Sequence, residues 1–243
     1  MANEHIVKSF DQELEALRRT IVQMGGLAES QLELAIQAVV RRDADLAGRV
    51  MRSDEQMDAY EASVDAAVVQ ILALRQPFAA DLREVISALR IASDLERIGD
   101  YAANIAKRSL ALAQVPVVRP VATLPRMGRM VQQIIKDVLD AYTERDLDKA
   151  LSAWRQDESV DDLYTSLFRE TLTYMMEDPR NITPCTHLLF IAKNIERIGD
   201  HATNIAELIH FLLTGKPVKD VRPKGDATSF TVVTPEAKPE DNA

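Results

Sequence analysis

A 16-residue segment occurs twice in this chain, at residues 91–106 and again at 191–206. The two copies, IASDLERIGDYAANIA and IAKNIERIGDHATNIA, are identical at 11 of 16 positions. Both contain Glu-Arg-Ile-Gly-Asp, followed four residues later by Asn. This repetition predicts a duplicated unit of about a hundred residues, with the same fold in each half. A duplicated scaffold needs to keep only its hydrophobic pattern, so the retained carboxylates indicate a site in each half.

Apolar residues recur every three or four positions along most of the chain, which is the period of an amphipathic helix. The first stripe runs from Phe10 to Met24 and continues less regularly to Val39, across Gly25-Gly26, which indicates a kink or a close helix contact. Capping residues and prolines set the later boundaries. In the first half we expect a second helix from the Asp43 cap to about Leu74 and a third from Pro77 to about Ala113. In the second half, a fourth helix is marked by Leu124 to Val138 and a fifth runs from about Asp146 to Glu177. A sixth is expected from Thr183, as its cap, and Pro184, as its first residue, to near Gly215.

Three long antiparallel helices with short loops form a bundle, and the duplication predicts two such bundles in tandem. The predicted fold class is therefore all-α, with residues 1–115 in the first three-helix bundle and residues 121–214 in the second. The segment QVPVVRP at 114–120 contains two prolines and is the predicted linker. Residues 215–243 have little apolar periodicity, and we expect a Pro-rich disordered tail.

Composition narrows the possible functions. The net charge is −9, whereas a duplex-DNA binder usually carries a basic face, so no nucleic-acid partner is expected. A lone cysteine, Cys185, excludes an internal disulfide and fits a reducing compartment. The N-terminus has no signal-peptide core, and no uninterrupted apolar run reaches the ~20 residues that span a bilayer. We therefore expect a soluble cytoplasmic protein that meets a membrane only through a partner.

Pairs of carboxylates four residues apart lie on one helix face. Like charges at this spacing destabilise a helix slightly, and a bound cation would remove that penalty. Because the pairs fall on consecutive helices, two pairs could converge on one multi-oxygen site in each half. Such a site suits Mg²⁺, Ca²⁺, Mn²⁺ or ferric iron better than a structural zinc site with Cys or His. The candidate metal ligands are Asp54, Asp58, Glu96 and Asp100 in the first half, and Asp157, Asp161, Glu196 and Asp200 in the second.

Plainer explanations exist for parts of this pattern. An acidic pair on one helix is usually solvated surface, although the duplication argues against that here. Arg97 and Arg197 are expected to pair with neighbouring acids. Gly99 and Gly199 each cost about 1 kcal/mol in a helix, so close helix packing is their expected role. The two faces also differ, since Glu61 and Asp65 extend the first and their counterparts are Tyr164 and Phe168.

Enzymatic motifs are missing from the sequence. It contains no phosphate-cradling glycine loop and no G-x-S-x-G nucleophile motif. A ferritin-like di-iron oxidase needs two Glu-x-x-His motifs, and the chain has one, Glu207–His210. Cys185 stands at a predicted helix start but has no counterpart in the repeat, so an inert thiol is expected. We predict that the protein is not an enzyme.

The repeated ERIGD segment, with IASDL and IAKNI upstream, resembles the PhoU family. The opening pattern F-x3-L-x2-L-x3-I-x2-M-G at residues 10–25 is also similar to that family, and the likeness covers about residues 5–214. It implies two PhoU-like three-helix bundles that often dimerise. Some members carry multinuclear iron or zinc clusters on E/D-x-x-x-D motifs. Those motifs fall here on Glu96/Asp100 and Glu196/Asp200, and the pairs on the preceding helices match the same pattern.

The resemblance also implies a function. PhoU-like proteins are negative regulators of the phosphate-starvation (Pho) response and of phosphate uptake. They act as adaptors between the ATPase of the phosphate ABC transporter, of the PstB type, and a sensor histidine kinase of the PhoR type. Two alternatives stay open: a carboxylate-rich metal-storage protein, and a scaffold that is indifferent to metal.

Overall fold

The computed structural model describes residues 2–219 and residue 228. This part of the chain contains six long helices, two short 3-10 turns and no strand. The expected all-α fold is therefore confirmed. The elements are α1 (Ala2–Arg41), α2 (Ala44–Arg75), α3 (Ala79–Leu112), η1 (Arg119–Thr123), α4 (Leu124–Glu144), α5 (Leu147–Glu177), η2 (Pro179–Asn181) and α6 (Ile182–Thr214).

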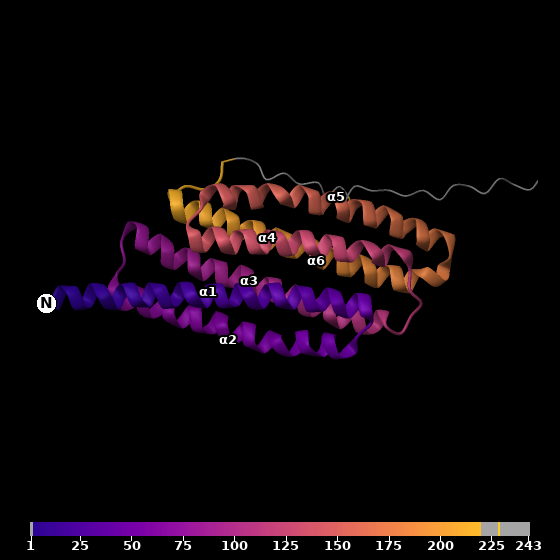
Figure 1. Cartoon of the computed structure of the whole chain (residues 1–243), viewed down its shortest axis with the longest axis horizontal. Helices are drawn as coiled ribbons and strands as arrows, with labels where there is room; N and C mark the ends of the chain where they lie inside the picture. The colour runs from indigo at the N-terminus through magenta and orange to yellow at the C-terminus, as the bar shows by residue number, and fades with distance from the viewer. Residues whose placement is uncertain (1, 220–227, 229–243) are drawn as a thin grey trace, which may run out of the picture.

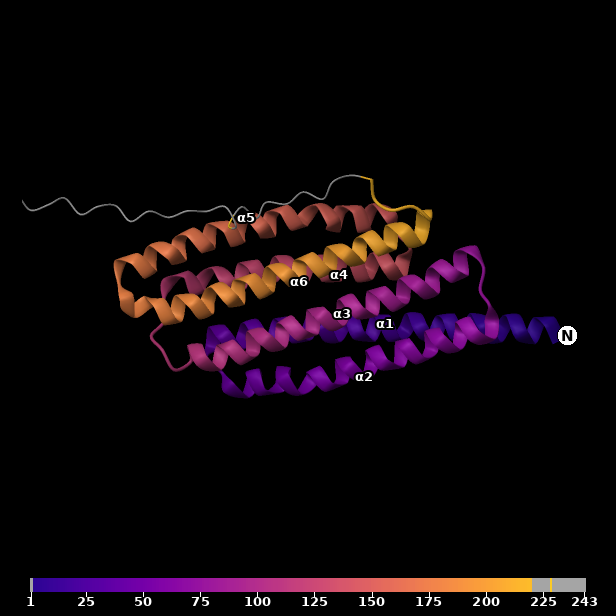
Figure 2. The same cartoon turned by 180° about the vertical axis from the view of Figure 1, so that it is seen from behind.

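The helices form two bundles that lie along one another. Figures 1 and 2 show α1–α3 on one side and α4–α6 on the other, with α2 and α5 at the outer edges. Across the boundary α3 packs against α6, more extensively than any other two helices pack, and α1 packs against α4. The residue limits of the two bundles stay predictions, and most of the predicted tail at 215–243 lies outside the described residues.

The ends of several helices follow the capping residues in the sequence. Asp43 caps α2, since its side chain accepts hydrogen bonds from the backbone N–H groups of residues 45 and 46. Its repeat counterpart Asp146 caps α5 by accepting from residue 149. Such a cap contributes about 1 kcal/mol. Gly215 closes α6 in the left-handed region at φ 72°, which glycine adopts without strain.

Two predicted helix starts are wrong. The third helix begins at Ala79 and not at Pro77, because Phe78 is extended (φ −115°, ψ 149°) and so keeps the proline in the loop. The sixth begins at Ile182, after the 3-10 turn, so Thr183 is not its cap. Pro184 lies inside the first turn, where its missing N–H group removes no helical hydrogen bond.

Glycines allow the two bundles to approach each other closely. A Cβ at Gly25 of α1 would overlap the side chain of Leu139 on α4, and a Cβ at Gly128 of α4 would overlap Ile36 on α1. Gly25 and Gly128 are equivalent in the repeat, 103 positions apart, and so are Ile36 and Leu139. The duplicated halves therefore meet through reciprocal contacts. The break in the apolar stripe at Gly25 therefore marks a close contact with α4, and α1 continues through it as one unbroken helix.

Candidate functional site

The first acidic face lies where α2 packs against α3. The pKa of Glu96 is raised to about 7, first by burial and then by the charge of Asp100. The pKa of Asp54 is also raised, first by burial and then by the charges of Asp100 and Asp58. Because Asp54 and Asp100 belong to different helices, the structure brings the two predicted pairs of the first half to one face.

Arg97 supplies the positive charge on this face. Its Nε lies 3.6 Å from Glu96 Oε2, and its Nη1 lies 3.2 Å from Asp100 Oδ2. The expectation of pairing with neighbouring acids is therefore confirmed for Arg97, whereas the guanidinium carbon of Arg197 lies 5.6 Å from the centre of the Tyr101 ring. The Arg97 side chain is 57% exposed, and an exposed pair of this kind contributes at most about 1 kcal/mol. Of its two partners, Asp100 is the more exposed, at 41% against 17% for Glu96.

The second acidic face, between α5 and α6, is more deeply buried. Asp157 is 2% exposed, Asp161 is 3% exposed and Glu196 is 4% exposed. Burial is the main reason that the pKa of Glu196 is raised to about 7. The hydrogen bond from Lys193 opposes this effect, and the charges of Asp200 and Asp161 add to it. Lys193 Nζ lies 2.7 Å from Glu196 Oε1, and is the cation of this face.

The two faces differ as their sequences predict. On the first face, burial and then the charge of Asp65 raise the pKa of Glu61, so this carboxyl belongs to the acidic cluster. On the second face, the counterpart Tyr164 lies beneath Lys193, whose Nζ is 4.9 Å from the ring centre. The ring centre of Tyr164 is also 6.4 Å from that of Phe168. At equivalent positions, the first face is thus extended by acidic side chains and the second face by aromatic rings.

The glycines of the repeated segment let neighbouring helices approach these faces. A Cβ at Gly199 would lie 3.1 Å from Asp157 Oδ1, which is tighter than an ordinary contact. A Cβ at Gly99 would lie 3.0 Å from Gln31 Oε1 and 3.2 Å from Met57 Cγ. The expected role of both glycines in close packing is confirmed. Gly199 also allows a carboxylate of α5 to lie directly against α6.

The donor atoms suit a hard cation. All the candidate ligands are carboxylates, and Glu196 Oε2 is buried and accepts no hydrogen bond, so it has capacity for a ligand. Within residues 2–219 and 228, however, no three or more His, Cys, Asp or Glu side chains are arranged as a metal site. Arg97 forms ion pairs with Glu96 and Asp100 on the first face, and Lys193 forms one with Glu196 on the second.

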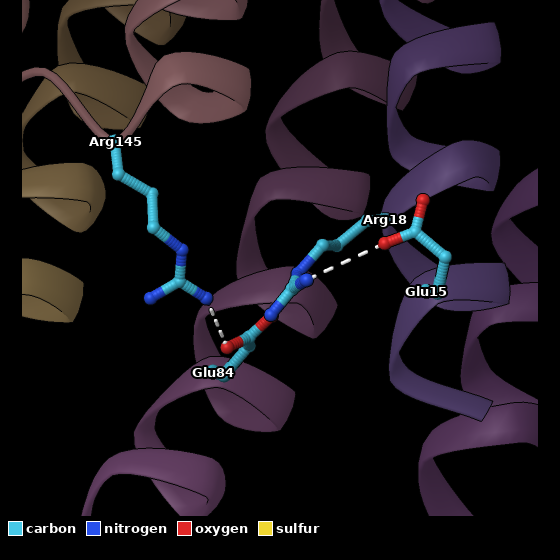
Figure 3. A network of polar contacts seen from close by, with 4 residues as sticks. All are labelled: Glu15, Arg18, Glu84 and Arg145. Atoms are coloured by element: carbon cyan, nitrogen blue, oxygen red, sulfur yellow. Dashed lines mark hydrogen bonds and ion pairs between the residues drawn. The ribbon is translucent and has the colours of Figure 1, made fainter. Parts of the chain in front are cut away.

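Figure 3 shows a buried ion network that the sequence analysis did not identify. Glu84 of α3 is 5% exposed and accepts hydrogen bonds from Arg18 of α1 and from Arg145, which follows α4. The Arg145 Nη2–Glu84 Oε2 distance is 2.6 Å. Glu15, more exposed, adds a contact to Arg18 at 3.4 Å. The sequence does contain a signal for the burial of Glu84. It lies two helical turns before Ile91, so it falls on the same buried face of α3 as the apolar residues.

A second polar contact joins the two bundles. His201 Nδ1 of α6 lies 2.8 Å from Asp94 Oδ1 of α3, and Asn204 Nδ2 donates to the same oxygen at 3.3 Å. The sequence analysis had identified neither contact, because they link residues more than 100 positions apart.

The remaining candidate groups have structural contacts. Cys185 is buried, and burial raises the pKa of its thiol, which disfavours the reactive thiolate. Glu207 accepts a hydrogen bond from Trp154 Nε1 at 2.9 Å, and His210 Nδ1 lies 2.9 Å from the carbonyl oxygen of Lys216. The single Glu-x-x-His motif is thus engaged in packing and at a helix end. None of the helices formed by the described residues is both long enough and apolar enough to span a membrane.

Comparison with known proteins gives consistent matches over most of the chain. The PhoU domain matches twice, at residues 21–109 and 124–209. The chain is 52% identical to the phosphate-specific transport system accessory protein PhoU homolog of Caulobacter vibrioides, over 93% of this chain and 99% of that protein. It is 39% identical to the phosphate-specific transport system accessory protein PhoU of Serratia marcescens, over 97% of this chain and 96% of that one.

Solved structures agree with this fold. PhoU from Pseudomonas aeruginosa superposes with a TM-score of 0.83 at 41% identity, covering 85% of this chain and all of the other. The phosphate transport system regulatory protein PhoU from Streptococcus pneumoniae superposes with a TM-score of 0.81 at 31% identity, covering 86% and 99% of the two chains. With two matched domains and relatives of this identity, the chain belongs to the PhoU family.

Proposed function

We propose that this chain is an accessory protein of phosphate-specific transport that represses the phosphate-starvation response and restrains phosphate uptake. The observation that carries the proposal is the 52% identity to a phosphate-specific transport system accessory protein across 93% of the chain. The fold supports it as well, because two helical bundles packed along one another offer broad surfaces, which suit protein docking.

In this proposal the protein is a non-catalytic adaptor, acting in the cytoplasm as a homodimer. One surface meets the transporter ATPase, of the PstB type, and another meets a sensor histidine kinase, of the PhoR type. Regulation needs no chemical step, since a difference in affinity for two states of the kinase is enough to shift its equilibrium.

Metal ions are proposed to bind at the two acidic faces, as multinuclear clusters of iron or zinc or as bound Mg²⁺, Mn²⁺ or Ca²⁺. The first face would use Asp54, Asp58, Glu96 and Asp100, and the second Asp157, Asp161, Glu196 and Asp200. A bound cation would favour the ionised form of Glu96 and Glu196, whose pKa values are about 7 without it. Metal affinity should therefore fall as the pH drops from 8 to 6, because protons compete for these oxygens.

A carboxylate-rich metal-storage protein is the second candidate function. The observation that favours it is the number of acids in each half, including the additional carboxyl Glu61, whose pKa is raised by burial and by the charge of Asp65. A storage protein would take up and release many ions reversibly, whereas a regulator needs only a small fixed number.

The regulatory role predicts a clear phenotype. A strain in which the gene for this chain is deleted should express its phosphate-scavenging genes constitutively in phosphate-rich medium. Supplying the wild-type chain should restore repression, as measured with a transcriptional reporter. Normal repression in the deletion strain would contradict the regulatory role, and a metal-storage protein would leave the reporter unchanged.

A further inference from the structure

The two bundles meet about an approximate two-fold axis that runs between α3 and α6. Tyr101 and His201 are repeat equivalents, and their ring centres lie 5.6 Å apart. Two equivalent residues in mutual contact mark the axis of an isologous interface. Each surface on one side of this pair therefore has an equivalent surface on the other side, built from residues 100 positions away.

On one side of the axis an open cleft of about 560 Å³ lies between α3 and α6. Two of its lining carboxylates are held in place, each by hydrogen bonds at one oxygen. Asp94 Oδ1 accepts from Asn204 and contacts the His201 ring, and Glu207 Oε1 accepts from the Trp154 indole. The cleft is lined by Arg90, Asp94, Asn204, Glu207, Leu208 and Phe211, and the chain after α6 completes its wall. We call this cleft the acidic groove.

The equivalent surface on the other side of the axis, which we call the counterpart surface, has the opposite charge. Equivalent positions there replace both carboxylates, one with an amide and one with a lysine. Its arginine belongs to α3, and the guanidinium carbon lies 4.0 Å from the centre of an aromatic ring on α6. The replacements for Arg90, Asp94, Glu207 and Leu208 are Phe190, Asn194, Lys107 and Arg108.

We propose that the acidic groove binds a lysine or arginine side chain presented by a partner protein. Its two oriented carboxylates exceed the single charge of Arg90, so a cationic group gains charge-assisted hydrogen bonds there. Leu208 and Phe211 supply an apolar wall for the aliphatic part of such a side chain. On the counterpart surface the guanidinium of Arg108 already lies against Phe190, which is a precedent within the same chain.

This inference rests on the proposed adaptor function and names the chemistry of one partner surface. Opposite charges on the acidic groove and the counterpart surface give a duplicated chain two unlike faces, so that it can discriminate between two partners. One partner should present a basic, partly apolar segment to the acidic groove.

The test uses the full chain and the peptide acetyl-Leu-Arg-Leu-Arg-amide, with a neutral peptide in which citrulline replaces arginine. Trp154 is the single tryptophan, so its indole N–H signal in NMR spectra reports directly on Glu207. We expect the arginine peptide to shift this signal and the citrulline peptide to leave it unchanged. Glu207→Gln and Asp94→Asn should each weaken arginine-peptide binding at least fivefold, the latter by introducing the residue of the other repeat.

Glu158→Gln is the matched control, because Glu158 is exposed on α5 and does not line the groove. It should bind the arginine peptide like the wild-type chain, and an unchanged melting temperature checks that each variant is folded. Equal binding of the two peptides, or wild-type affinity in both Glu207→Gln and Asp94→Asn, would overturn the proposal.

Pull-down of the transporter ATPase and the kinase separates this inference from the adaptor function. If neither partner associates with the wild-type chain, the adaptor function fails, while the peptide result decides the groove. If a partner associates equally with wild type and with Asp94→Asn, and the peptide does not bind, the groove proposal alone fails. Loss of partner association in Asp94→Asn but not in Glu158→Gln supports both.

Discussion

Replacing Glu84 with alanine is expected to lower the free energy of unfolding by about 3 kcal/mol. This carboxylate is 5% exposed and lies between Arg18 and Arg145, which come from different bundles. Its removal leaves two guanidinium groups facing each other without their common acceptor. Both arginines remain partly exposed, which keeps the loss at the lower end of that for a buried pair. Chemical denaturation followed by circular dichroism measures the change.

Glu15→Ala is the matched control for this variant. Glu15 contacts the same Arg18 at 3.4 Å, but its side chain is 56% exposed, so its removal should cost less than about 0.5 kcal/mol. Equal stability of the two alanine variants would show that the buried network does not hold the bundles together.

The contribution of Glu84 should also depend on pH. Burial opposes its ionisation, but the hydrogen bonds from Arg18 and Arg145 outweigh burial and lower its pKa. A carboxyl with a lower pKa in the folded state stabilises the fold above its unfolded pKa of about 4.3. That contribution is lost as the pH falls through the folded value. The stability difference between wild type and Glu84→Ala should therefore be full at pH 7 and shrink below about pH 4.

Replacing Gly128 with leucine is expected to cost about 3 kcal/mol, by overpacking the contact between α1 and α4. Even a Cβ at this position would overlap Ile36 Cδ1, and Ile36 is buried, 8% exposed. The extra atoms must push the two bundles apart or force Ile36 out of its rotamer. Thermal unfolding measures the loss, and Ile36→Ala should recover part of it in the double variant, because it removes the overlapping atoms.

Gly26→Leu separates this contact from a general effect of glycine replacement. Gly26 is exposed on α1, and a Cβ there would meet no atom within 4 Å. The variant should be as stable as wild type or slightly more so, because glycine costs about 1 kcal/mol inside a helix. A Gly128→Leu protein with wild-type stability would contradict the close approach of α1 and α4.

Local signals in the sequence determine most of the fold. The apolar stripe that contains Met127 and Val131 is buried in α4 as predicted, and Asp43 caps α2, because periodicity and capping depend on residues within a few positions. The start of α3 at Ala79 could not be predicted in this way. A proline can open a helix or lie in the preceding loop, and the extended backbone at Phe78 keeps it in the loop here.

The candidate site divides in the same way. The spacing of Glu96 and Asp100 placed them on one helix face. The second acidic pair, on the preceding helix, predicted that α2 would contribute to the same site. Contacts across the two bundles have no local signal. Asn204 follows Asp200 by one helical turn on α6, yet its side chain donates to Asp94 of α3. That contact depends on the approximate two-fold packing of the halves, which periodicity along one helix cannot predict.

If the duplicated carboxylates are metal ligands, as we propose, the purified protein should contain metal that depends on them. Three proteins would be purified in parallel and analysed for iron, zinc, manganese, magnesium and calcium. They are the wild-type chain, the four-acid variant Glu96→Ala/Asp100→Ala/Glu196→Ala/Asp200→Ala, and a control variant. The control replaces four exposed acids with alanine: Asp11, Glu33, Asp81 and Glu158. We predict bound metal in the wild type and the control, and loss of most of it in the four-acid variant. The same metal content in the four-acid variant and in the wild type would contradict the assignment of these ligands.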